Sequence, residues 1–377
     1  MAPAHIPCAV LMPAPAPYRE PLFTTLAAHD QIGLRVIYSS PRQTSWDQPA
    51  EWFAGERSYD AVYLRAYELP RRGRTPVSWP RGLERALSTF GARVVVSSEF
   101  GPATLRALAW CRRRERPLVI LTEVTRDVEA TLPAPQRALH RWLAARAQGF
   151  VAVSSRARKR LLGISVPFDA IELSLQSADL EPIRAAAGAR QPPSSRSSIR
   201  LVTVGRLVPD KNFSRLVEAL ALAGGSADRA ELHVHGVGPL ELELREVASR
   251  LGVTAVFHGF STAAEMANAY AEADIFALVS TFEPFGAAVR EAVAAGLPLL
   301  CSRRVGAVDD LALEGRNALL VDPEDVGAIA SALRRLCDDD ALRAKLATGS
   351  RAVDAEHDFG RDVEAFAAAI QRAAGGG

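Results

Sequence analysis

The sequence predicts an α/β protein with two Rossmann-like domains, each built around a parallel sheet. Short apolar runs of strand length alternate with amphipathic helical stretches, an order that produces parallel sheets with right-handed crossovers. The alternation starts twice, before and after a segment rich in Pro, Ser, Gly and Ala at residues 185–198. A chain of 377 residues also exceeds the usual size of a single hydrophobic core.

The first half contains six β-type runs, separated in several places by amphipathic stretches. Residues 83–90 and 103–114 are examples of predicted helices between them. The predicted strands are residues 6–12, 34–39, 60–64, 92–98, 117–122 and 149–154.

The second half repeats the pattern with six further runs and helices between them. A final amphipathic helix is predicted over residues 359–374, before three terminal glycines. The predicted strands are residues 199–205, 230–236, 255–259, 273–279, 298–302 and 318–321.

These elements predict a domain organisation in which a ligand binds between two sheets, outside the carboxyl ends of the strands. The last helix is expected to pack back on the first domain. The predicted parts are a first domain over residues 1–185, a linker over 186–198, a second domain over 199–355 and the last helix within 356–377.

The composition is that of a soluble globular protein, with 48% apolar and 23% charged residues. No apolar run approaches the roughly 18 residues of a membrane helix, and the first residues do not resemble a secretory signal. A net charge of +2 argues against a dedicated nucleic-acid binder. Four scattered cysteines predict reduced, buried thiols. We therefore expect a cytoplasmic protein, with peripheral contact at the inner face of the membrane as an alternative.

The most informative motif is STFEPFGAAVREAVAAG, residues 280–296. It follows a predicted strand, so it is expected to form a tight turn and then a helix that begins near Gly286. Glu283 falls in the turn and Glu291 in the second helical turn. A helix N-terminus offers unpaired N–H groups and a positive dipole end, which suit a phosphate or sugar phosphate.

The second motif is VTVGRLVPDKNFSRLVEAL, residues 202–220. Arg206 and Lys211 follow the first strand of the second domain, and Lys211 is one of only three lysines in the chain. Guanidinium and ammonium groups at the end of a strand suit an anion. The alternative is a pair of solvated surface cations.

Together GRLVPDKN and STFEPFGAAVREAVAAGLP resemble the retaining nucleotide-sugar glycosyltransferases of glycosyltransferase family 4, which have the GT-B fold. The resemblance covers most of residues 200–335 and extends more weakly into the first half. It implies transfer of a sugar from a nucleoside diphosphate to an acceptor hydroxyl, in the biosynthesis of a glycan, a glycolipid or a glycosylated natural product. A UDP-sugar is favoured as donor and GDP-mannose is the alternative.

The resemblance also implies a role for each matching residue. Arg206 and Lys211 would hold the donor diphosphate, and Glu283, with the backbone at Phe285 and Gly286, would contact the donor sugar. Glu291 would accept hydrogen bonds from the ribose. The resemblance implies neither a cofactor nor a metal, and the acceptor would attack from the face that the leaving group vacates.

The first domain departs from the family pattern. The loop after its first strand reads MPAPAPYRE and lacks the glycines that would face phosphates. Tyr18 and Arg19 in this loop are expected to shape the acceptor site. Glu123 stands where the family often has a histidine, and it is a candidate to orient the acceptor hydroxyl or take its proton. A plain surface glutamate is the alternative for Glu123.

Several readings remain open from the sequence. The rival functions are a sugar-nucleotide epimerase or hydrolase, and a non-catalytic sugar-nucleotide-binding subunit. The basic stretches 106–116 and 137–160 would either dock on an anionic membrane that carries a lipid-linked acceptor, or form solvated helix faces. HGVGPLE at residues 235–241 resembles part of a dinucleotide fingerprint, but an ordinary strand-to-helix turn is preferred.

Trp46 and Trp52 are candidates to stack on a substrate ring.

Overall fold

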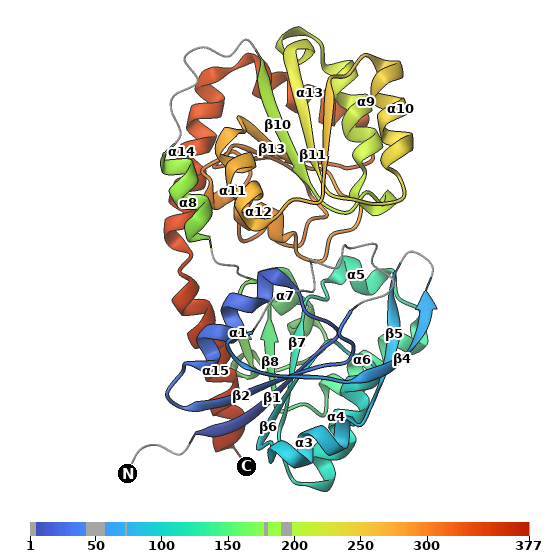
Figure 1. The fold of residues 1–377 in the computed structure, drawn as a ribbon, viewed down its shortest axis with the longest axis vertical. Coiled ribbons are helices and arrows are strands. Elements are labelled where there is room, and N and C mark those ends of the chain that lie inside the picture. Colours follow the sequence, from blue (N-terminus) through green and yellow to red (C-terminus); the bar gives the residue numbers. More distant parts are fainter. Residues whose placement is uncertain (1–4, 43–56, 72–73, 177–179, 190–197, 377) are drawn as a thin grey trace. The chain divides into compact units, whose positions relative to one another are not determined.

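The chain forms two compact units, each with its own parallel sheet and surrounding helices (Figure 1). The first unit combines Met1–Ala178 with Phe359–Gly377, and the second is Asp179–Asp358. This architecture confirms the α/β class with two parallel-sheet domains. The computed structural model describes residues 5–42, 57–71, 74–176, 180–189 and 198–376.

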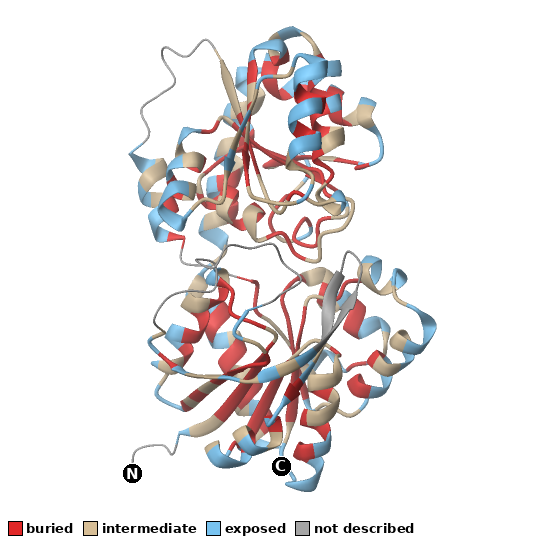
Figure 2. Ribbon diagram, turned by 45° about the vertical axis from the view of Figure 1, so that its right-hand side comes forward, coloured by how far each residue is buried: buried red, intermediate tan, exposed pale blue. Residues whose placement is uncertain are grey.

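The sheet of the first unit has seven parallel strands in the order β3-β2-β1-β6-β7-β8-β9. Two of its interior strands, β7 and β8, are buried throughout, because helices cover both faces of a parallel sheet (Figure 2). The strands are β1 (Ile6–Met12), β2 (Ile32–Tyr38), β3 (Asp60–Tyr63), β6 (Val94–Ser98), β7 (Leu118–Thr122), β8 (Gly149–Ala152) and β9 (Ile171–Leu173).

Seven α-helices and two short 3-10 turns are described in this unit. The helices are α1 (Glu20–Ala27), α3 (Leu83–Phe90), α4 (Pro102–Arg113), α5 (Arg126–Ala130), α6 (Ala134–Ala144), α7 (Ser155–Gly163) and α15 (Phe359–Gly375). The 3-10 turns are η1 (Pro17–Arg19) and η2 (Phe168–Ala170).

A two-stranded antiparallel hairpin, β4 (Arg65–Arg71) and β5 (Arg74–Arg81), was not predicted from the sequence. Its strands contain Pro70 and Pro76, and proline within a run argues against a strand because it donates no ladder hydrogen bond. The hairpin packs against α4 at the side of the unit rather than extending the main sheet (Figure 1).

The sheet of the second unit has six parallel strands in the order β12-β11-β10-β13-β14-β15. In chain order this is 3-2-1-4-5-6, the arrangement of a dinucleotide-binding Rossmann fold. The strands are β10 (Ile199–Val204), β11 (Ala230–His235), β12 (Ala255–Gly259), β13 (Ile275–Leu278), β14 (Leu299–Ser302) and β15 (Ala318–Val321).

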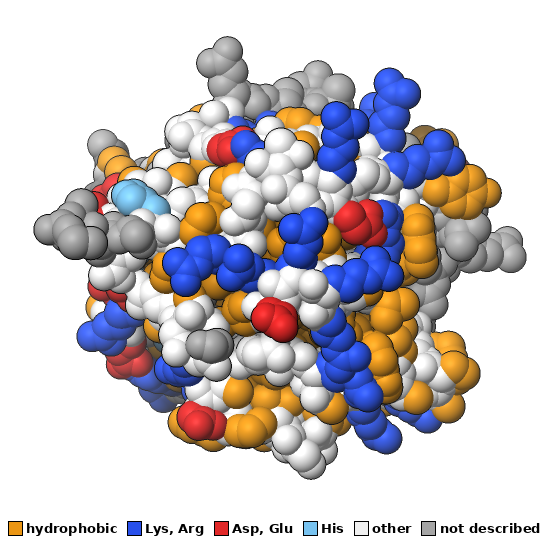
Figure 3. Space-filling view, turned by 90° about the horizontal axis from the view of Figure 1, so that it is seen from below, with side chains coloured by type: hydrophobic (Ala, Val, Ile, Leu, Met, Phe, Trp, Pro, Cys, Tyr) orange, Lys and Arg blue, Asp and Glu red, His pale blue; other side chains and the backbone are white. Residues whose placement is uncertain are grey.

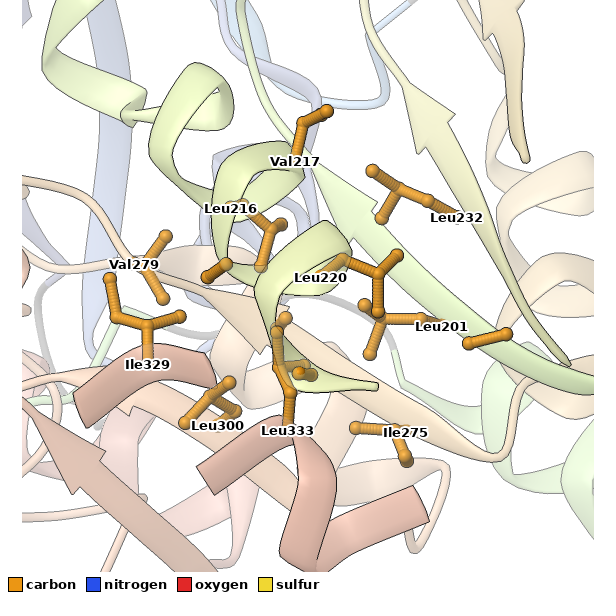
Figure 4. Packing of buried hydrophobic residues seen from close by; sticks show 14 of the residues in the cluster. Leu201, Leu216, Val217, Leu220, Leu232, Ile275, Val279, Leu300, Ile329 and Leu333 are labelled. Atoms are coloured by element: carbon orange, nitrogen blue, oxygen red, sulfur yellow. The ribbon is translucent and has the colours of Figure 1, made fainter. Parts of the chain in front are cut away.

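The core of the second unit lies between this sheet and the helices that follow its strands. Leu216 and Leu220 of α9 meet Leu201 and Ile275 of the sheet and Leu333 of α13 (Figure 4). The helices are α8 (Glu181–Gly188), α9 (Phe213–Ala223), α10 (Glu241–Leu251), α11 (Ala263–Glu272), α12 (Ala287–Ala294), α13 (Val326–Asp338) and α14 (Asp340–Glu356), with 3-10 turns η3 (Pro209–Lys211) and η4 (Gly225–Arg229).

The boundary between the units lies before residue 185, where the sequence analysis ended the first domain. Helix α8 packs against α11, and Arg184 Nε donates to Asp354 Oδ2 at 2.7 Å. The start of the predicted linker is therefore the end of a helix of the second unit. Residues 190–197 of that linker lie outside the described residues, as do Trp46 and Trp52.

The last helix returns to the first unit, as the sequence predicts. Helix α15 packs against β8 and β9. Near its start, Asp362 Oδ1 accepts a hydrogen bond from Leu175 N at 2.8 Å. Phe366 and Ile370 on its inner face are fully buried. The first unit is thus completed by residues that follow the whole second unit in the chain.

The four cysteines are free and buried, as predicted. No helix in the described part of the chain has both the length and the apolar character needed to cross a membrane. Within the same residues, no group of three or more His, Cys, Asp or Glu side chains is arranged to hold a metal ion.

We predict that Phe366→Ala lowers the free energy of unfolding of the first unit by about 3–5 kcal/mol, because it removes a fully buried aromatic ring. All five tryptophans precede residue 179, so denaturant unfolding followed by tryptophan fluorescence reports on this unit. Glu364→Ala on the same helix is the control, since its side chain is 73% exposed. Equal midpoints for the two variants would show that α15 does not stabilise the unit.

Candidate functional site

The predicted donor-side residues lie at the point where the strand order of the second sheet reverses. The chain runs from β10 outward to β12 on one side and then crosses to β13 on the other. At such a switch point the loops after the two central strands diverge at their carboxyl ends, which leaves room for a ligand. Arg206 and Lys211 follow β10, and Glu283, Phe285 and Gly286 follow β13.

The loop after β10 is fixed by backbone contacts with the turn after β11. Gly205 N donates to His235 O at 3.0 Å, and Leu207 N donates to Val237 O at 2.9 Å. A Cβ atom on Gly236 would lie 1.9 Å from Gly205 O, so only glycine permits this approach. The glycines of HGVGPLE thus serve close packing, in agreement with the ordinary turn that the sequence favoured. Arg206 lies between two anchored residues and is half-buried.

Lys211 ends the turn η3, immediately before Asn212 and helix α9. Asn212 has a left-handed backbone, with φ of 61°, and its buried Nδ2 donates to Val279 O at 2.9 Å and to Pro323 O at 2.8 Å. Thr281 N also donates to Asp210 O at 2.9 Å. These bonds tie the start of α9 to the end of β13, which holds Lys211 beside the EPFG turn.

Lys211 and Glu283, 72 positions apart in the chain, form an ion pair between Nζ and Oε2. Their side chains are only 16% and 12% exposed. Low exposure strengthens the attraction relative to a pair in bulk water. The structure therefore brings together the cation and the carboxylate that the sequence assigned to one site.

The EPFG turn is held from its other side by the loop after β14. Glu283 O accepts a hydrogen bond from Gly306 N, and Phe285 O accepts one from Ala307 N, each at 2.9 Å. A Cβ atom on Gly306 would lie 1.8 Å from Pro284 O. The Phe285 side chain is buried, so this residue could meet a ligand only through its backbone.

Helix α12 begins at this turn. Gly286 precedes its first residue with φ of 96°, a conformation that favours glycine. The first N–H groups of the helix and its positive dipole end lie at the same edge as the Lys211–Glu283 pair. This end of the sheet therefore combines a lysine cation, a carboxylate and a helix N-terminus, which suits an anionic group joined to a hydroxyl-bearing one.

Glu291 lies further along α12 and is paired with a residue that the sequence analysis did not identify. Tyr270 of α11 donates its hydroxyl to Glu291 Oε2 at 2.7 Å, and Tyr270 is fully buried. Burial raises the pKa of Glu291, and the hydrogen bond from Tyr270 opposes that rise. The Tyr270 contact fixes one carboxyl oxygen, so Glu291 would offer the other to a hydroxyl group.

A second polar cluster lies in the first unit. Tyr18 and Arg19 form the turn after β1, and Glu123 follows β7. Arg19 Nη2 pairs with Glu123 Oε1, so the structure brings these two candidate acceptor-side residues together. Glu99, directly after β6, accepts a hydrogen bond from Glu123 N and was not identified from the sequence. Its position at a strand end in SSEFG was the available signal.

The three histidines of the second sheet are stacked on one another. His235 and His258 rings lie 4.2 Å apart, and His233 Nδ1 lies 3.0 Å from His258 Nε2. Burial, followed by the neighbouring histidines, lowers the pKa of His235 to about 4. The three rings are thus packed side by side in the sheet, and burial favours the neutral form of His235.

The arginines of the two basic stretches, 106–116 and 137–160, fall into two groups. Some form ion pairs with carboxylates, and others are exposed to solvent. Arg106 pairs with Glu84, and Arg160 is fully buried and bound to Glu129 at 2.8 Å. These two do not belong to an exposed cationic face. The face in Figure 3 nevertheless carries many Lys and Arg side chains beside apolar ones. The exposed residues of the two stretches include Arg112, Arg113, Arg114, Arg116, Arg141 and Trp142.

Residues 189–353 match the protein family described as "Glycosyl transferases group 1". The lipopolysaccharide core biosynthesis glycosyltransferase LpsD of Rhizobium meliloti is 33% identical over 184 residues, which cover 45% of this chain and 51% of LpsD. A GDP-mannose-dependent phosphatidylinositol dimannoside mannosyltransferase of Mycobacterium tuberculosis is 27% identical over 285 residues and covers 73% of each chain. The chain spans at most about half the length of the first three curated relatives that it matches.

Solved structures match the fold over nearly the whole chain. The structure of Anabaena HepE in complex with UDP and glucose has a TM-score of 0.76 at 17% identity, and covers 97% of this chain and 100% of HepE. Sucrose-phosphate synthase of Thermosynechococcus elongatus has a TM-score of 0.73 at 20% identity, with coverage of 96% and 97%. The fold is therefore GT-B, as the sequence predicts.

We predict that Gly306→Ala lowers the melting temperature of the second unit by at least about 4 °C. The new Cβ would overlap Pro284 O, so the loops after β13 and β14 must separate. Gly188→Ala is the matched control, because no atom lies within 4 Å of a Cβ at that position. Circular dichroism at 222 nm during heating measures both. Equal melting temperatures for the two variants would contradict this close packing.

Proposed function

We propose that the protein is a retaining, metal-independent glycosyltransferase of family 4 that transfers a sugar from a nucleoside diphosphate to an acceptor hydroxyl. The observation that carries the proposal is the Lys211–Glu283 pair at the switch point of the second sheet, beside the N-terminus of α12. The match to a glycosyltransferase family over residues 189–353 supports the same conclusion.

The donor diphosphate binds to Lys211 and Arg206. When the donor enters, a phosphate oxygen replaces Glu283 as the partner of the Lys211 ammonium group, and the Arg206 guanidinium offers paired donors to the same diphosphate. Glu283 is then released to accept hydrogen bonds from sugar hydroxyls. The first N–H groups of α12 add further positive potential at the phosphate. Glu291 accepts from the ribose through its free oxygen.

Bond cleavage at the anomeric carbon moves negative charge onto the diphosphate. Lys211, Arg206 and the helix N-terminus stabilise that charge as it develops, so the leaving group is assisted without a metal ion. Glu283 serves as a hydroxyl acceptor rather than as a nucleophile. The acceptor oxygen attacks from the side of the departing diphosphate, and the configuration of the sugar is retained. Glu123 orients the acceptor hydroxyl and takes its proton as the new glycosidic bond forms, and Tyr18 and Arg19 shape the acceptor site.

UDP-sugar is the favoured donor and GDP-mannose the alternative. HepE structures contain UDP and UDP-glucose, which supports uridine as the base. The mycobacterial relative is GDP-mannose-dependent by name, which supports the alternative. The acceptor is a hydroxyl-bearing molecule in glycan, glycolipid or glycosylated natural-product biosynthesis, and a lipid-linked acceptor would require contact with the inner face of the membrane.

We predict that UDP at 100 times its dissociation constant stabilises the second unit by about 2.7 kcal/mol, and that Lys211→Ala loses most of this effect. The reason is the loss of the cation that binds the diphosphate. Lys345→Ala is the matched control, since Lys345 is an exposed lysine of the same unit. A thermal-shift titration with UDP, GDP and ADP measures the stabilisation and identifies the base.

Stabilisation of Lys211→Ala equal to that of the control would contradict the donor site. Turnover then separates the rival functions. Release of UDP from UDP-glucose without an acceptor would favour a hydrolase, and interconversion of the sugar an epimerase. Binding without turnover over a broad acceptor panel would favour a non-catalytic subunit.

Peripheral membrane contact through the exposed arginines near Trp142 gives a separate prediction. We expect the protein to sediment with phosphatidylglycerol vesicles, and we expect Arg113→Gln/Arg114→Gln to weaken binding roughly tenfold or more, since each basic residue contributes about 1 kcal/mol near an anionic surface. Arg229→Gln/Arg250→Gln removes the same charge from exposed positions of the second unit and is the control. Equal sedimentation of both double variants would exclude this face as the docking surface.

A further inference from the structure

The first sheet has a switch point of its own. Its order β3-β2-β1-β6-β7-β8-β9 reverses between β1 and β6, just as the second sheet reverses between β10 and β13. The turn with Tyr18 and Arg19 follows β1, and Glu99 directly follows β6. The carboxyl ends of these two strands are thus the favoured place for a ligand in this unit, and Glu99 occupies one of them.

Glu99 is held there in a strained conformation. Its φ of 61° lies in the left-handed region, which is uncommon for residues other than glycine and asparagine. The next residue, Phe100, is buried and fixed from two directions. Its ring stacks on His140 with centroids 4.7 Å apart, and the Arg160 guanidinium carbon lies 4.9 Å from its centroid. Packing therefore maintains a backbone geometry that the local sequence disfavours, a feature that clusters at functional sites.

The Glu99 carboxylate fixes the start of the next loop. Oε1 accepts a hydrogen bond from Glu123 N at 2.6 Å, and Oε2 accepts one from Thr122 Oγ1 at 2.9 Å. Thr122 Oγ1 in turn accepts from Val124 N at 3.1 Å. Because a carboxylate offers about four acceptor positions, Glu99 retains capacity for a hydroxyl donor from a ligand.

Glu99 has one charged neighbour of each sign, the carboxylate of Glu123 and the guanidinium group of Arg19. Burial first, and the neighbouring Glu123 second, raise the pKa of Glu99 to about 7, whereas hydrogen bonds from Glu123 N and Thr122 and the charge of Arg19 oppose the rise. Arg19 is itself paired with Glu123. The site thus has one cation, already engaged, against two carboxyl groups, which disfavours an anionic ligand.

Gln176 supplies a further acceptor. It forms a side-chain hydrogen bond with Tyr18, the neighbour of Arg19, and only 8% of it is exposed. Its Oε1 atom is buried and has no hydrogen-bond donor among the described residues. A buried amide oxygen without a donor is destabilising, and a hydroxyl group of a ligand would satisfy it.

We propose that Glu99, Glu123, Tyr18, Arg19 and Gln176 form one binding site for an uncharged, hydroxyl-rich ligand such as a sugar ring, and that Glu99 is its positioning residue. The site presents mainly hydrogen-bond acceptors, so its ligand must bring donors. Glu99 acts by fixing the chain at Glu123. In the proposed glycosyltransferase this ligand is the acceptor, so the inference deepens that function and rests on it.

Ligand-observed NMR titration of the full-length protein at pH 8 tests the site. The probes are methyl α-D-glucopyranoside and methyl α-D-mannopyranoside as neutral glycosides, and glucuronate as the anionic comparison. We expect saturable binding of a neutral glycoside, weaker binding of glucuronate, and roughly tenfold weaker glycoside binding by Glu99→Gln. The matched control is Glu115→Gln, because Glu115 is exposed yet shares the left-handed backbone, with φ of 52°.

The pH dependence of glycoside affinity shows whether Glu99 positions the binding site or only stabilises the fold. Ionised Glu99 accepts all its hydrogen bonds, so glycoside affinity should fall as the pH drops through about 7 in the wild type and stay constant in Glu99→Gln. The charged groups that face Glu99 are Glu123 and Arg19. His140, which stacks on Phe100, stays uncharged over this range because burial and Arg160 lower its pKa to about 4.

If Glu99→Gln does not fold, Gln176→Leu decides the matter: we expect it to weaken glycoside binding and keep the pH dependence. Binding of neutral glycosides that is absent, equal in all variants, or weaker than that of glucuronate overturns the proposal. Stabilisation of the second unit by UDP, measured in parallel, distinguishes failure of this site from failure of the proposed function. UDP binding without glycoside binding rejects only this site, and Glu99-dependent glycoside binding without UDP binding rejects only the proposed function.

Discussion

The structure depends on one topological constraint: in each sheet the chain leaves the first strand, winds to one edge and then crosses to the other side. Because all strands of a sheet are parallel, their following loops gather at one edge. The reversal separates two of these loops at the centre of that edge. Lys211 with Glu283 in one unit, and Arg19 with Glu99 in the other, lie where the reversal occurs.

Topology alone would leave these loops loosely placed, and backbone contacts fix them. Asn212 joins the start of α9 to the ends of two other segments through its amide group. Gly236 and Gly306 allow neighbouring loops to approach until no Cβ atom could fit between them. The side chains that would bind a ligand are therefore carried on a framework of main-chain hydrogen bonds, which fixes the backbone positions from which they extend.

Periodicity sufficed to predict most strands of both sheets, and the two motifs were enough to predict that Lys211 and Glu283 belong to one part of the second unit, where the structure pairs them. The remaining features depend on contacts that are distant in the sequence. Tyr270 reads as an ordinary apolar position of an amphipathic helix until its hydroxyl is seen against Glu291. Glu99 belongs to no motif, and only the parallel alignment of β6 with β7 brings it to Glu123. The β4–β5 hairpin contains prolines that argue against strands, and packing on α4 overrides that local signal.

Because α15 packs on the first unit, the order in which the ribosome synthesises the chain affects how that unit folds. Synthesis proceeds from the N-terminus, so β8 and β9 emerge long before the helix that covers them. Their apolar face must stay uncovered while the entire second unit is translated. The second unit is continuous in sequence and can fold as soon as it is made, whereas the first reaches its final packing only after α15 has been synthesised. The first unit therefore completes its core after the second, although its strands are synthesised first.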